Sequence, residues 1–170
     1  MIRFAGLAAA LICGACSSTI YTENDSEIRI LVGAGGLIGS KVHTYTELMD
    51  TGKRIVIDGH LVSADAFIGF SVPGVCYTEN AAFSPHAASY LGLWPARDVT
   101  ERLTSMLPEP LGDWFRGNLG YYDWIGFPVL EYDDLLRIWP EGACRQEDVR
   151  RARSVTAPDH RASAPITGPG

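Results

Sequence analysis

The chain has 170 residues and a formal net charge of -6 at pH 7, with 46% hydrophobic and 20% charged residues. This length predicts one domain with a sizeable core, and the composition excludes a wholly disordered chain. The acidic balance argues against nucleic acid as a partner, because binding to phosphates requires a basic face. After the N-terminus, no apolar run reaches the roughly 18 residues that a membrane-spanning helix needs.

Residues 1–15 have the pattern of a secretory signal peptide. Arg3 supplies a positive charge, a short apolar stretch follows, and small residues stand at the cleavage point. We therefore expect an exported, periplasmic protein, in a compartment where disulfides are permitted. Cys16 follows Gly14 and Ala15 as in a bacterial lipobox, which predicts lipidation of Cys16 and a lipid anchor to the membrane. Cleavage at a nearby site without a lipid is the alternative.

The expected domain covers residues 27–144 and has a mixed α/β pattern. A polar tether is expected over 16–26, and a disordered tail over 145–170. Short apolar runs bounded by turn residues predict strands at 27–32, 54–58, 75–78 and 82–84, with Gly59 ending the second. Helices are expected at 37–51, 63–70, 97–107 and 131–139. The alternation of strands and helices predicts a largely parallel sheet flanked by helices.

Two cysteines fall inside the expected domain. Cys76 lies in an expected core strand, and Cys144 lies at the end of the domain. In an oxidising compartment they can pair as a disulfide that joins these two places. Two separate buried thiols are the alternative, because sequence spacing does not establish bonding distance.

Three spaced elements are candidates for chemistry. Gly35 and Gly36 follow a strand directly, where glycine amides can stabilise an oxyanion, although an ordinary turn is the commoner reason for such a pair. Ser63 opens a helix, which suits a nucleophile but also an N-cap. His86 ends a strand and could take the serine proton, or serve as a hydrogen-bonded loop residue. The glycine spacing fits neither a dinucleotide fingerprint nor a phosphate-binding loop.

The order of these elements resembles the proteolytic subunit of Clp protease and the wider crotonase-like superfamily. The greatest likeness is to exported bacterial proteins described as predicted periplasmic Clp-protease-like proteins. The resemblance covers roughly residues 27–92 and extends more faintly to 144. It implies a crotonase-like core of ββα repeats. The roles that it implies are Ser63 as nucleophile, His86 as base, and Gly35, Gly36 and Ala64 as the oxyanion hole.

The chain departs from this pattern in two respects. Leu61 and Asp65 stand where the exported relatives often carry cysteines, and an acid so near the serine either disturbs the site or faces solvent. The third triad member does not align cleanly. Asp123 is the nearest acid, and it would either orient His86 or lie in a loop at the surface.

These observations favour an exported serine hydrolase, a peptidase acting on peptide or ester bonds without a cofactor. The alternative is a catalytically inactive crotonase-like envelope lipoprotein that acts as a binding or interaction module, with the aromatic stretch 114–127 as its contact surface. Acyl-CoA chemistry is disfavoured by export. No metal site is expected, because His43 and His60 have no partner at ligand spacing. A homo-oligomer is compatible with the resemblance, but the short core gives no reason to assume a ring.

Overall fold

The computed structural model describes residues 18–90, 94–119 and 128–145. The expected signal peptide at 1–15, the lipidation of Cys16 and the tail beyond 145 lie outside the described residues. Asp123 and most of the aromatic stretch lie outside them as well. Within the described ranges, no helix is long and apolar enough to cross a membrane.

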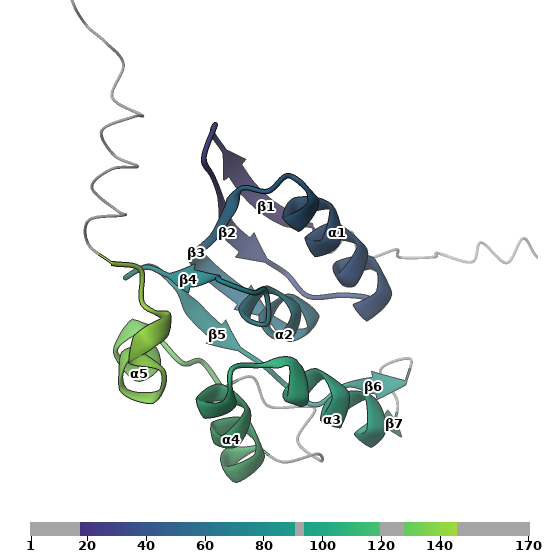
Figure 1. The fold of residues 1–170 in the computed structure, drawn as a ribbon. Coiled ribbons are helices and arrows are strands. Elements are labelled where there is room, and N and C mark those ends of the chain that lie inside the picture. The colour runs from purple at the N-terminus through teal and green to yellow at the C-terminus, as the bar shows by residue number, and fades with distance from the viewer. Residues whose placement is uncertain (1–17, 91–93, 120–127, 146–170) are drawn as a thin grey trace, which may run out of the picture.

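The described chain forms a mixed α/β fold around a mostly parallel sheet (Figure 1). Its five strands are β1 (Thr19–Glu23), β2 (Glu27–Gly33), β3 (Arg54–Val62), β4 (Cys76–Tyr77) and β5 (Ala82–Ser84). β1 pairs antiparallel with β2, whereas β2 pairs parallel with β3. The short strands β4 and β5 both pair parallel with β3 along its other edge. The predicted largely parallel sheet is therefore confirmed.

Five helices flank this sheet in the described part of the chain. They are α1 (Ile38–Asp50), α2 (Ser63–Phe70), α3 (Arg97–Met106), α4 (Glu109–Asn118) and α5 (Tyr132–Ile138). A short antiparallel pair, β6 (Ser89–Tyr90) and β7 (Trp94–Pro95), precedes α3, and a 3-10 turn at Pro140–Gly142 follows α5. Figure 1 shows α1 and α2 packed side by side, with α3 and α4 next to α2 and β5.

The hydrophobic core lies between the sheet and these helices. Ile28, Ile30 and Ile57 of the sheet are fully buried, and each such side chain contributes about 1.5–3 kcal/mol through burial. Phe67 of α2 packs edge-on against Phe115 of α4, with ring centroids 5.2 Å apart. The described start of the aromatic stretch thus fills the core, and Phe115 is not part of a contact surface.

The polar segment before the core is not a simple tether. Residues 19–23 form β1, which pairs with β2 at the edge of the sheet. The interpretation of 16–26 as a tether was based on polarity and is wrong for these residues. An edge strand has one neighbour and can expose most of its side chains, so β-branched Thr and an alternating pattern suffice to form it.

The second predicted strand does not end at Gly59. β3 continues to Val62, and a Cβ at position 59 would lie 1.8 Å from the carbonyl oxygen of Leu31. Gly59 therefore permits close approach of β2 and β3, at the point where their register shifts between Ile30 and Val32.

Helix α4 was missed in the sequence because prolines and glycines interrupt its pattern. Pro110 lies in the first turn, where a proline has no intrahelical bond to lose. Leu111 and Phe115, four residues apart, are both fully buried. Tertiary packing of this face thus outweighs the low helix propensity of Gly112 and Gly117.

A disulfide joins β4 to the end of the described chain. Cys76 and Cys144 are bonded with their Cα atoms 4.9 Å apart, and the structure therefore has no pair of separate thiols here. The amide of Cys144 also donates to the carbonyl of Tyr77 at 2.9 Å. The bond spans 68 residues of sequence, including β5 and the helices α3 through α5, so its main effect is on the entropy of the unfolded chain.

We expect Cys144→Ser to lower the free energy of unfolding by about 2–4 kcal/mol under oxidising conditions, because the long cross-link is lost. Thermal and urea unfolding followed by circular dichroism measures this difference. Reduced wild-type protein is the matched control, and its unfolding midpoint should equal that of the variant. An oxidised variant with a wild-type midpoint would contradict the prediction.

Candidate active site

The candidate site lies at the carboxyl ends of three neighbouring parallel strands. Gly33 of β2 is level with Leu61 of β3, and Val62 of β3 is level with Ser84 of β5. The strands therefore end at one edge of the sheet, where α/β proteins commonly place their ligands. The segments that follow β2, β3 and β5 carry, respectively, the glycine loop (Gly35 and Gly36), Ser63 and His86.

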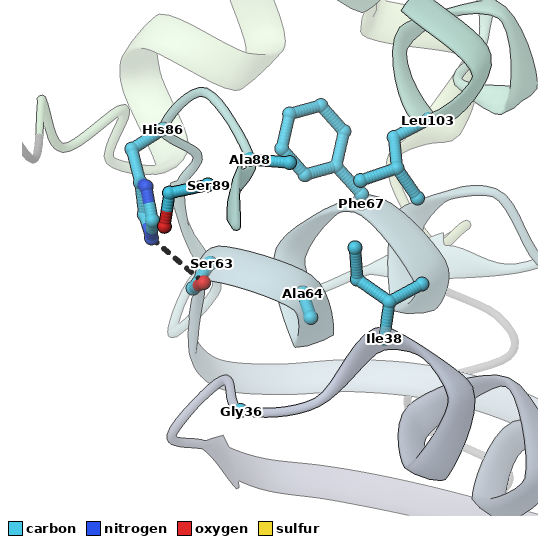
Figure 2. Close-up of a pocket in the computed structure, with 9 residues that line it drawn as sticks. All are labelled: Gly36, Ile38, Ser63, Ala64, Phe67, His86, Ala88, Ser89 and Leu103. Atoms are coloured by element: carbon cyan, nitrogen blue, oxygen red, sulfur yellow. Dashed lines mark hydrogen bonds between the residues drawn. The ribbon is translucent and has the colours of Figure 1, made fainter. Parts of the chain in front are cut away.

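The structure brings Ser63 and His86 into direct contact. Ser63 Oγ lies 2.7 Å from His86 Nε2, and His86 Nδ1 lies 2.9 Å from the carbonyl oxygen of Ala87 (Figure 2). A carbonyl only accepts, so the geometry assigns the proton to Nδ1 and leaves Nε2 as an acceptor in the neutral ring. Ser63 then donates its hydroxyl proton to Nε2. This is the arrangement that removal of the serine proton by a base requires.

Burial keeps the imidazole neutral. His86 is half-buried, and desolvation lowers its pKa below the usual value of 6.5, while the hydrogen bond to Ala87 opposes this shift. A lowered pKa leaves the unprotonated ring dominant at neutral pH. A neutral imidazole in this position is able to accept a proton.

The backbone of Ser63 has an unusual conformation for a serine. Its φ is +57°, the only positive value outside glycine in the described residues. The N-cap of α2 is Val62, and no side-chain cap is formed, so Ser63 does not serve as the N-cap that sequence considerations also allowed. A non-glycine residue in this region stores strain and is common at functional sites. Here the strained turn directs Oγ toward His86.

A small cavity of about 90 Å³ opens beside the Ser63–His86 pair. Figure 2 shows Ile38, Phe67 and Leu103 on the side of the cavity away from His86. These three residues were not identified as site residues from the sequence, because apolar positions in helices look the same whether they line a cavity or fill a core. The cavity is large enough for a few water molecules or one modest side chain.

Gly36 and Ala64 line the cavity, as the oxyanion assignment requires. Ala64 lies in the first turn of α2, where amides have no partner within the helix. Gly35 departs from its expected role, because its amide donates to Asp65 Oδ2 at 2.8 Å. The proposed set of amides is thereby reduced to Gly36 and Ala64.

Asp65 neither faces solvent nor remains unpaired. It is fully buried, and its Oδ2 lies 2.7 Å from Nζ of Lys41, which is also buried. Thr19 donates to Asp65 Oδ1 at 2.8 Å. The charge of Asp65, together with burial, raises the pKa of the neighbouring Tyr45 phenol, with burial the larger cause.

Within the described part of the chain, the two other histidines lie away from this arrangement. His60 Nε2 is 2.9 Å from Oγ of the buried Ser84, and exposed His43 is 3.4 Å from Glu47 on α1. Within residues 18–90, 94–119 and 128–145, no group of three or more His, Cys, Asp or Glu side chains could hold a metal ion.

Comparisons with known proteins give no match. No family model matches the chain, and the searches of the curated proteins and of the solved structures found no match.

Gly35 should not tolerate a side chain. Its φ is +80°, and a Cβ there would lie 2.6 Å from Cβ of Ser63, so we expect Gly35→Ala to destabilise the fold by about 1–3 kcal/mol. Gly39→Ala is the matched control, because nothing lies within 4 Å and α1 should gain about 0.5–1 kcal/mol. Urea unfolding measures the stability of the two variants, and equal values would count against the close packing of Gly35 on Ser63.

The His86 ring should titrate below 6.5 in the folded protein, because burial disfavours its charged form and lowers its pKa. The unfolded chain then binds more protons as the pH falls through this range, so stability decreases with acidification. Imidazole NMR shifts recorded against pH measure the midpoint, with urea-unfolded protein as the control. A folded midpoint at or above the unfolded one would overturn the assignment.

Proposed function

We propose that the protein is a serine hydrolase that cleaves peptide or ester bonds with Ser63 as nucleophile and His86 as base. The observation that carries this proposal is the 2.7 Å contact between Ser63 Oγ and His86 Nε2, with Nδ1 held by the Ala87 carbonyl. A serine hydroxyl at its ordinary pKa is a weak nucleophile, and an adjacent neutral imidazole is a common means of activating it.

The reaction follows from this geometry in two stages. Ser63 Oγ attacks the substrate carbonyl carbon while its proton passes to His86 Nε2. The developing negative charge on the carbonyl oxygen is then stabilised by the backbone amides of Gly36 and Ala64. His86 returns the proton to the leaving amine or alcohol, and an acyl group remains on Ser63. Water, deprotonated by His86, next attacks the acyl carbon; the bond to Ser63 Oγ breaks, His86 returns the proton to that oxygen, and the acid is released.

The order of elements supports a relationship to the Clp protease proteolytic subunit and the crotonase-like superfamily. In this proposal the glycine loop follows β2, the nucleophile starts α2 after β3, and the base follows β5. The proposal keeps Asp123, which lies outside the described residues, as the third triad member; to orient His86 it would have to replace the Ala87 carbonyl as the acceptor of the Nδ1 proton. Its role in orienting His86 forms part of the proposal.

We further propose that the protein acts in the periplasm, after removal of residues 1–15, and that Cys16 carries a lipid anchor. The Cys76–Cys144 disulfide supports export, because such bonds persist in oxidising compartments and are rare in the cytosol. The substrate is then a peptide or ester of the cell envelope.

A fluorophosphonate probe tests the hydrolase directly, because it reacts with serines activated by a neighbouring base. We expect the purified protein to be labelled, and Ser63→Ala and His86→Ala to lose at least about 99% of the labelling rate, an effect of about 10² or more. Mass spectrometry of the modified peptide should place the label on Ser63.

Ser84→Ala is the matched control, because Ser84 also contacts a histidine but is 1% exposed. Its labelling rate should equal that of the wild type. Folded wild-type protein that does not react, or Ser63→Ala protein that labels at the normal rate, would refute the hydrolase. The first of these results would favour a crotonase-like binding module in the envelope.

A further inference from the structure

A buried ion pair lies directly behind the candidate active site. Asp65 belongs to the first turn of α2, two residues after Ser63, and Lys41 belongs to α1. The side chain of Asp65 is 0% exposed and that of Lys41 is 2% exposed, with 2.7 Å between the carboxylate and the ammonium group. Asp and Lys are almost never this deeply buried unless they are paired.

The pair connects segments that are far apart in the sequence. Asp65 Oδ2 accepts the amide of Gly35, and Oδ1 accepts the hydroxyl of Thr19 on β1. Lys41 also donates to Thr19 Oγ1 at 2.8 Å, which closes the network. One carboxylate thus holds β1, the glycine loop, α1 and α2 together.

Gly33 makes room for this carboxylate because glycine has no side chain. A Cβ at Gly33 would lie 2.5 Å from Cβ of Asp65 and 2.7 Å from its Cγ. The end of β2 therefore packs directly on Asp65, and the glycine loop begins against the carboxylate. A buried anion with three donors fixes geometry more narrowly than apolar contact does, because each hydrogen bond is directional.

We propose that Asp65, paired with Lys41, is the positioning residue of the glycine loop. Asp65 holds the Gly35 amide and thereby keeps Gly35 against Ser63, so close that a Cβ built on Gly35 would lie 2.6 Å from Cβ of Ser63. Gly36, the next residue, then lines the cavity. Asp65 itself touches no reacting atom. This inference rests on the proposed hydrolase, in which the Gly36 amide stabilises the oxyanion.

Lys41 supplies the counter-charge of the buried Asp65 carboxylate. Removing Lys41 alone would leave a buried carboxylate without its counter-charge, which is strongly destabilising. Removing both charges together avoids that penalty. Comparing the single variant with the double variant therefore distinguishes a loss of fold stability from a displacement of the glycine loop.

The experiment compares Lys41→Met, the double variant Asp65→Ala with Lys41→Met, and Asp58→Asn. Asp58→Asn is the matched control, because it also breaks an ion pair on the sheet, with Arg29 at 2.9 Å, and that pair lies away from the glycine loop. Three quantities are measured: the unfolding midpoint, the hydrogen-exchange rate of the Gly35 amide by NMR, and the rate of fluorophosphonate labelling at Ser63.

We expect Lys41→Met to be the least stable variant and the double variant to recover part of that loss. The Gly35 amide should nevertheless exchange at least about tenfold faster in the double variant, and labelling should slow by about 10–100-fold, as for a displaced oxyanion donor. Asp58→Asn should lose stability only. If Lys41→Met does not fold, the double variant and the control still give the comparison.

Wild-type exchange at Gly35 in the double variant would overturn the proposal, whatever happens to labelling. Wild-type labelling in the double variant would overturn it equally. If the wild-type protein itself does not label, the hydrolase fails, and faster exchange at Gly35 still supports the positioning role of Asp65. The two failures are thus distinguishable.

Discussion

β2 packs so closely on β3 and on the start of α2 that a side chain would not fit at two glycines. A Cβ at Gly59 would meet the Leu31 carbonyl, and one at Gly33 would meet Asp65. This close parallel contact determines where the chain goes next, because the loop after β2 then lies against the start of α2. The glycine loop, the strained Ser63 turn and the buried Asp65 all follow from that approach. Parallel pairing of β5 adds His86 at the same edge.

The site places opposite electrostatic requirements on neighbouring groups. His86 must stay neutral to accept a proton, and burial lowers its pKa accordingly. Asp65 is an anion in the interior, and its charge is balanced by Lys41 and by the donors of Thr19 and Gly35. Because the Asp65 carboxylate is hydrogen-bonded to its own donors, it can coexist with a neutral His86 ring near the same helix start. The first turn of one helix therefore carries both the proposed nucleophile and a buried, paired carboxylate.

Local patterns explain which parts of the molecule were predictable. Alternation and helical spacing identified β2, α1, α2 and β5, and the strand-to-loop position identified Ser63 and His86. The edge strand β1 was missed because its residues are mostly polar, although it pairs with the neighbouring β2. The helix α4 was missed because its prolines and glycines interrupt the pattern, and Phe115 is buried against Phe67, which is distant in sequence. The pairing of Asp65 with Lys41 left no local signal either. It depends on the packing of α1 against α2, and Asp65 was recognised only as a departure from the expected motif.

A purely structural role for Ser63 accounts poorly for its conformation. A serine at a helix start ordinarily stabilises the helix by capping, yet the N-cap of α2 is Val62 and Ser63 makes no cap. Its φ of +57° instead stores strain, which the surrounding packing of Gly35 and Asp65 must hold. Strain that opposes stability is maintained where it serves a function. Because the strained turn brings the Ser63 hydroxyl to His86 Nε2 rather than into a helix cap, its geometry supports the proposal that Ser63 is a nucleophile.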